Sequence, residues 1–152
     1  HYSGPFTNTG PVPPRAEQET TYTITWTINN TANPVSSAQV MTSLPTYSKW
    51  LGVISPSSEN VTYNEATHEI TWRIGQIQRG AGSSGGEKEV SFQVALTPSI
   101  SQIGSAIPII TDTTLSGTDT FTGVKLTSNK GQLSTQLFND PGFPPNGGIV
   151  VQ

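Results

Sequence analysis

The chain contains no cysteine, and charged residues are also scarce. Without thiols it can form no disulfide, no thiolate metal site and no cysteine nucleophile, although this does not fix the compartment. Asp, Glu, Lys and Arg make up 11% of the 152 residues, and the net charge is −3. With seven basic and ten acidic residues, the sequence predicts no positively charged surface that would bind nucleic acid. No apolar run approaches the roughly 18 residues of a membrane span, so we expect none in this chain.

Histidine is nearly absent as well, which limits the catalytic and metal chemistry available. The two histidines are His1 and His68, and a Ser-His-Asp triad would have to use His68. Two histidines without cysteine build a transition-metal site only with added carboxylates. Asp112 and Asp119 lie beside threonine-rich turns and form a weak calcium candidate, because the sequence has no Asp-x-Asp-x-Asp-Gly loop. We therefore expect no catalytic residue, no metal and no cofactor, and the chain is predicted not to be an enzyme.

The residues that are abundant favour β structure. The chain has 22 threonines, 17 serines, 12 isoleucines and 10 valines. Threonine, valine and isoleucine suit pleated strands, whereas a helical protein would need more alanine, leucine, glutamate and lysine. At 152 residues the chain has the length of one domain and can bury roughly 70% of its unfolded surface.

The clearest pattern lies at residues 20–30, where apolar and threonine side chains alternate strictly. One face carries Tyr22, Ile24, Trp26 and Ile28, and the other carries Thr21, Thr23, Thr25 and Thr27. This period of two predicts a strand of an antiparallel sheet, with one packed face and one wet face. Trp26, Trp50 and Trp72 are predicted to be core residues.

Further strands are expected at short spacing and without helical periods between them. They cover residues 38–44, 50–54, 60–63, 69–74, 87–97, 107–115, 118–126 and 132–138, with a turn at Ser116-Gly117 and one helical turn within 99–104. The fold class predicted is all-β: an immunoglobulin-like antiparallel β-sandwich of about eight strands with extended N- and C-terminal arms. A barrel is the alternative, because short alternating strands serve both architectures.

Three segments are predicted. Residues 1–19 form an extended N-terminal arm rich in proline and glycine, residues 20–138 form the sandwich, and residues 139–152 form a Gly/Pro-rich linker and a C-terminal strand. The β-branched run at 149–151 is either a last edge strand of the same domain or a strand that pairs with a neighbour. The first residues do not resemble a signal peptide, so an exported protein is expected here in its mature form.

Ten short segments, taken in order, resemble an immunoglobulin-like repeat family of bacterial and archaeal cell-surface proteins, the conserved repeat domain of unknown function. The segments are GPVPP (10–14), TTYT (20–23), Trp26, NNT (29–31), LP (44–45), WLG (50–52), ITW (70–72), VSF (90–92), GTDTFTG (117–123) and DPGFPP (140–145). The resemblance implies an extracellular structural role without catalytic residues. Such domains usually sit in long tandem chains.

The function predicted is a non-catalytic structural module of the bacterial cell surface, located extracellularly. It is expected to be a subunit of a fibre or repeat assembly whose neighbours are joined by β-strand addition. The partners are other copies of the chain or neighbouring surface domains. The expected interface residues lie in the two arms: Tyr2, Phe6, Ile149, Val150 and Val151.

Two alternatives stay open. An adhesin or carbohydrate-binding sandwich would bind a glycan through loop aromatics, for which Tyr47, Trp50 and Phe143 are the candidates. An internal isopeptide crosslink would need a buried lysine next to an Asn or Asp and an acid. Lys125, between Val124 and Leu126, is the best candidate lysine, but strand alternation can equally direct it outward.

Overall fold

A computed structural model of the chain describes residues 4–83, 86–138, 140 and 142–152. These residues form an antiparallel β-sandwich, as predicted, and a single 3-10 turn at Ile100–Gln102 within the expected segment. The strands are β1 (Thr20–Ile28), β2 (Val35–Ser43), β3 (Ser48–Ser55), β4 (Asn60–Asn64), β5 (Glu69–Ile77), β6 (Lys88–Leu96), β7 (Pro108–Ile110), β8 (Thr113–Asp119), β9 (Lys125–Lys130) and β10 (Leu133–Ser134).

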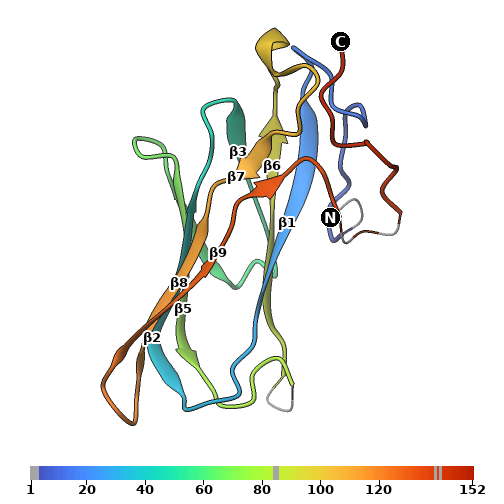
Figure 1. Cartoon of the computed structure of the whole chain (residues 1–152). Helices are drawn as coiled ribbons and strands as arrows, with labels where there is room; N and C mark the ends of the chain where they lie inside the picture. Colours follow the sequence, from blue (N-terminus) through green and yellow to red (C-terminus); the bar gives the residue numbers. More distant parts are fainter. Residues whose placement is uncertain (1–3, 84–85, 139, 141) are drawn as a thin grey trace.

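The strands form two packed layers (Figure 1). One sheet has the order β1-β6-β3, and the other has the order β4-β5-β2-β8-β9. The short pair β10-β7 is separate from both. The β8–β9 hairpin reaches the end of the molecule opposite to the C-terminus (Figure 1).

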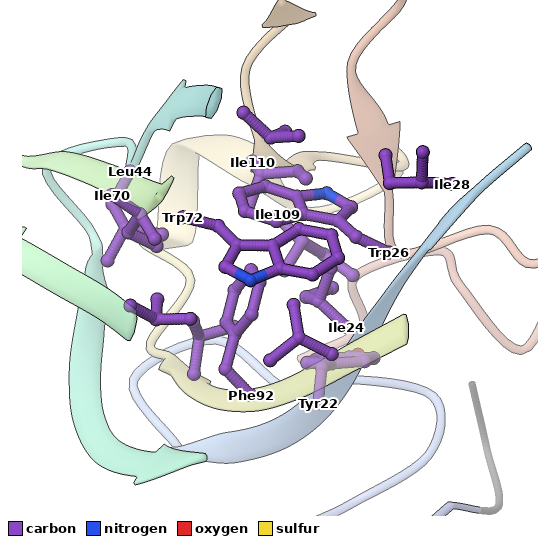
Figure 2. Packing of buried hydrophobic residues seen from close by; sticks show 14 of the residues in the cluster. Tyr22, Ile24, Trp26, Ile28, Leu44, Ile70, Trp72, Phe92, Ile109 and Ile110 are labelled. Atoms are coloured by element: carbon purple, nitrogen blue, oxygen red, sulfur yellow. The ribbon is translucent and has the colours of Figure 1, made fainter. Parts of the chain in front are cut away.

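The core lies between the layers and contains the inward residues that the alternation predicts. Trp72 stacks on Trp26 with ring centroids 6.4 Å apart, and Phe92 meets Trp26 edge-on at 4.8 Å (Figure 2). Tyr22, Ile24 and Ile28 are buried beside them. Trp26 and Trp72 are therefore core residues, and β1 has the orientation that its sequence indicates.

The threonine face of β1 is less exposed to solvent than the alternation predicts. Thr23 is fully buried and Thr21 is 8% exposed, whereas Thr27 is exposed. The N-terminal arm covers the first half of this face, and Thr9 binds Thr21 through both its backbone N–H and its backbone C=O. Period two fixes which residues share a face, but it carries no information on which distant segment covers them.

The predicted turn at Ser116-Gly117 is wrong, because both residues lie inside β8. The chain turns later, between β8 and β9, around residues 120–123. Gly117 serves a close approach: a Cβ atom there would collide with the side chain of Val35 on β2. A glycine in a strand can mark such an approach instead of a turn.

The strand predicted at 132–138 is only two residues long in the structure. Its partner β7 offers three residues, so a longer strand would have no ladder to join. The chain leaves the sheet at Thr135, and Phe138 is 86% exposed. The predicted strand at 107–115 is likewise divided between β7 and β8.

Candidate functional site

The C-terminal strand pairs within its own chain. Val150 is 1% exposed; its N–H donates to the carbonyl of Ser105, and its carbonyl accepts from Gly104. Val151 forms a parallel bridge with Arg15, and Ile149 forms an antiparallel bridge with Ala106. Of the two possibilities for this segment, the structure therefore shows pairing on the same domain.

Thr135 fastens this tail to the body of the sandwich. It is fully buried; its hydroxyl donates to the carbonyl of Gly148 and accepts from the N–H of Ile107 at 3.1 Å. Gly148 lies so close to the backbone of Gln136 that any Cβ atom would collide with it. The tail is thus held by a glycine contact and a buried hydroxyl in addition to its backbone bonds.

The N-terminal arm lies across the threonine face of the first half of β1, where it reaches β6, and bonds the outer edge of β1 at Thr21. The Gln93 side chain donates to the carbonyl of Thr7 and to the side chain of Asn8, at 3.0 and 3.1 Å. Phe6 is half-buried and lines a hollow with Phe143. Tyr2 lies outside the described residues. The arm and the tail meet through Arg15, so the predicted interface residues belong to two neighbouring extended segments.

Each of the three aromatics proposed for glycan binding contacts a different part of the protein. The Tyr47 hydroxyl donates to the Pro108 carbonyl at 3.0 Å, and Trp50 stacks on Tyr63 with centroids 5.9 Å apart. Phe143 lies in the hollow beside the N-terminal arm. Sequence reasoning missed two exposed aromatics, Phe121 between β8 and β9 and Phe138 after β10, each 86% exposed.

The polar side chains considered for chemistry are engaged locally. His68 Nδ1 lies 3.0 Å from the Tyr63 hydroxyl, and Asp112 accepts from the N–H of Gln132. The pKa of Asp119 is lowered, chiefly because its carboxylate accepts from the backbone of Thr122. Within the described ranges no three His, Cys, Asp or Glu side chains gather as metal ligands. Lys125 is exposed on β9, and the part of the chain that is described includes no helix long and apolar enough to cross a membrane.

The two long sides of the sandwich differ. On one side the stacked Trp50 of β3 and Tyr63 of β4 fill the space between the sheets, and Trp50 also packs on Phe92 with centroids 5.4 Å apart. The other side, between β1 and β9, holds a groove of about 460 Å3. Its lining includes Trp26, Ile28, Val40, Leu115 and Leu133.

This open-side groove continues in both directions along β1. A hollow of about 350 Å3 extends it past Ile24 toward Leu137, and another of about 160 Å3 extends it between Asn30 and Leu126. The groove therefore follows most of the length of β1. The wall opposite β1 is the β8–β9 hairpin in the part beside Trp26 to Asn30, and residues of the segment 132–138 in the part beside Tyr22 to Ile24.

Comparison with known proteins gives a structural likeness and no sequence relative. No family model matches the chain, and no curated protein matches it, so membership of the conserved repeat family stays a prediction. The crystal structure of a variant of BcpA, the major pilin subunit of Bacillus cereus, superposes on 81% of this chain with a TM-score of 0.52 and 14% sequence identity. The match covers 36% of that pilin chain. At this identity the likeness shows a shared β-sandwich fold.

Proposed function

We propose that the chain is a non-catalytic structural module of the bacterial cell surface, a subunit of an extracellular fibre whose neighbours are joined by β-strand addition. The observation that carries this proposal is that both terminal segments dock on the sandwich in extended form. The tail is held by backbone hydrogen bonds such as Val150 to Ser105, whereas the arm combines one backbone bond to β1, from Thr21 to Thr9, with bonds that involve side chains.

Segments held in this way can be exchanged between copies. A tail that leaves its own domain and enters that of a neighbour makes the same backbone bonds there, and Val150 fills the same core position. The donor then leaves its own site empty for the next copy. Such a head-to-tail contact does not close on itself unless it forms a ring, so it propagates into a fibre.

The fold supports this assignment. The sandwich resembles the structure of a protein that is named as a major pilin subunit, which is a fibre component. The same proposal implies an extracellular location. It also implies that the binding partners are other copies of the chain or neighbouring surface domains.

Removal of each terminal segment tests the proposal. We expect that deletion of residues 147–152, or of residues 1–9, shifts the protein from large assemblies to small species by light scattering and removes fibres from electron micrographs. Because the first deletion empties a core position, a synthetic peptide of residues 144–152 is added back in trans. Restored thermal stability without restored assembly is the expected result for the peptide.

The proposal is overturned if both deletions leave the assembly state unchanged. It is equally overturned if the intact chain remains monomeric at all concentrations reached.

A further inference from the structure

The outer edge of β1 has backbone groups that find no partner among the described residues, beyond the part of the N-terminal arm that the structure describes. The N–H of Thr21 points to the arm, since it donates to Thr9. Alternate residues of a strand point the same way, so the N–H and C=O of Thr25 and Thr27 also point away from β6. Neither residue has a backbone partner on that side within the described part of the chain.

The outer edge of β9 is free in the same way. The N–H of Asp119 donates to the carbonyl of Val124, which places the even-numbered residues of β9 toward β8. Lys125, Thr127 and Asn129 therefore direct their backbone groups outward, and all six residues of β9 are exposed. The two lysines stand at the ends of the strand, and the four residues between them are uncharged.

Both free edges lie on the same side of the sandwich, on the two walls of the open-side groove. Unpaired edge groups favour the addition of a strand, and an apolar floor favours apolar side chains on one face of that strand. Natural edge strands are usually shielded by proline, bulges or a covering segment. Among the described residues, the arm contacts β1 as far as Thr23, whose hydroxyl donates to the Asn8 side chain.

We propose that the open sides of two copies face each other in a two-fold symmetric dimer, in which β1 of each copy pairs with β9 of the other. A single partner then satisfies both edges at once. A head-to-tail chain would instead have to seat two different neighbours in the same groove. Two-fold dimers with a self-complementary face are the commonest oligomers.

The register follows from the height of the strands along the groove. β1 and β9 run in opposite directions, and the groove brings Ile28 to the level of Leu126–Ser128. A two-fold axis parallel to the strands does not shift residues along the strand direction. Thr27 of one copy therefore lies opposite Thr127 of the other, and Thr25 lies opposite Asn129, as hydrogen-bonded antiparallel pairs. Residues opposite each other in such a pair share a face, so Leu126 lies beside Ile28 over the groove.

This pairing also covers apolar surface that one copy leaves in water. Val124 is 55% exposed and Leu126 is 42% exposed. It uses a different part of the edge from the terminal segments, because no described residue of the arm or the tail has a backbone bond to Thr25, Thr27 or Ile28. The dimer therefore goes beyond the fibre contact proposed above, and the two contacts can coexist.

Proline at an outward-facing edge position tests the pairing. Thr27→Pro removes an N–H that has no partner within the described chain, so an edge strand tolerates it. Thr27→Val is the matched control: both variants lose the bond from Thr27 to Glu89, but valine keeps the N–H. By sedimentation equilibrium on the full chain, at concentrations below those at which fibres form, we expect wild type and Thr27→Val to form dimers with similar Kd, and Thr27→Pro to weaken the dimer about tenfold or more.

Cross-linking tests the register on folded protein. The chain has no cysteine, so Thr27→Cys and Thr127→Cys each carry a single thiol. Paired Cα atoms about 5.5 Å apart can form a disulfide, so we expect the mixed variants to yield a covalent dimer under oxidation. Thr27→Cys mixed with Thr62→Cys, which lies on the far edge strand β4, is expected to give none.

Three results would overturn the dimer: a monomeric wild type at about millimolar concentration, equal Kd values for the proline and valine variants, or equal cross-linking of the two cysteine mixtures. Thr127→Pro against Thr127→Val repeats the test on β9 if Thr27→Pro fails to fold. Deletion of residues 1–9 separates this proposal from the fibre: it is expected to abolish fibres and to leave the dimer intact.

Discussion

Tyr22 places a hydroxyl in the core without a hydrogen-bond partner among the described residues. Burial raises the pKa of this hydroxyl, so it stays neutral. An unsatisfied buried polar group costs about 1–3 kcal/mol. We expect Tyr22→Phe to raise the free energy of unfolding by about 1 kcal/mol, measured by urea denaturation.

Tyr47→Phe is the matched control, because the Tyr47 hydroxyl donates to Pro108. It should lower the free energy of unfolding by about 1 kcal/mol. Equal losses from both substitutions would mean that the Tyr22 hydroxyl has a partner.

Glu59 joins a turn to the core, since its carboxylate accepts from Trp72 Nε1 and Lys88 Nζ at 2.8 Å each. Burial acts to raise the pKa of Glu59, but hydrogen bonds from Lys88 and Trp72, with the charge of Lys88, bring the pKa below its ordinary value. A carboxyl group whose pKa is lower in the folded than in the unfolded chain stabilises the fold at pH values above the unfolded pKa. This stabilisation is lost as the pH falls through the pKa of the folded chain.

We therefore expect Glu59→Gln to lower the free energy of unfolding by about 1 kcal/mol at pH 7. Between pH 6 and pH 3 the free energy of unfolding of this variant should fall less than that of wild type. Urea denaturation across this range measures both effects. Identical pH profiles for the two proteins would show that Glu59 is not responsible for acid sensitivity.

Sequence alternation predicts Trp26 and Trp72 as core residues because each lies in a strand with a clear inward register. Trp50 differs: it is half-buried at the edge of the sandwich and stacks on Tyr63 from the other sheet. That contact depends on how the two sheets are packed, which a local pattern does not encode.

Among the segments, the C-terminal tail depends most on one side chain. Thr135 is fully buried and bonds both Gly148 and Ile107. Thr135→Val keeps the shape but leaves a buried N–H and a buried carbonyl unsatisfied, so we expect a loss of about 2 kcal/mol in the free energy of unfolding. Tail amides such as that of Val150 should also exchange faster with deuterium.

Thr135→Ser retains the hydroxyl and is the control; it should keep the slow exchange of the tail. If Thr135→Val leaves both stability and tail exchange unchanged, the hydroxyl does not hold the tail.

Strand boundaries at the start of the chain follow the sequence more closely than those near its end. β1, β5 and β6 have clean alternation, and the structure places them close to their predicted ranges. From residue 107 onward, glycine and threonine suggest turns and strands about equally. The close approach of Gly117 to Val35, which decides the outcome, is a tertiary contact.

Strands of the same protein differ in how far they are enclosed: β6 pairs on both sides, whereas β1 and β9 are edge strands. β6 lies between β1 and β3, and its residues from Val90 to Leu96 are buried. We expect its amides to exchange only on global unfolding, whereas those of Thr25 and Thr27 exchange fast in dilute solution.

Hydrogen exchange at two protein concentrations measures both expectations. The amides of Thr25 and Thr27 should slow down at high concentration if the edges pair between copies, and those of β6 should not change. Fast exchange in β6 would contradict the sheet order.

The sandwich could be predicted from its alternating strands, but its open side could not. Which edges stay unpaired depends on strand order, and no local pattern shows that β1 and β9 end on the same side. The candidate site is for this reason a property of the assembled sheets.

The position of Val150 has a consequence for biosynthesis. The Val150 side chain completes the core, its backbone bonds to Gly104 and Ser105, and Val151 pairs with Arg15. A nascent polypeptide thus lacks part of its interior until these residues have left the ribosome tunnel. The two layers therefore reach their final packing only after this stretch has been synthesised.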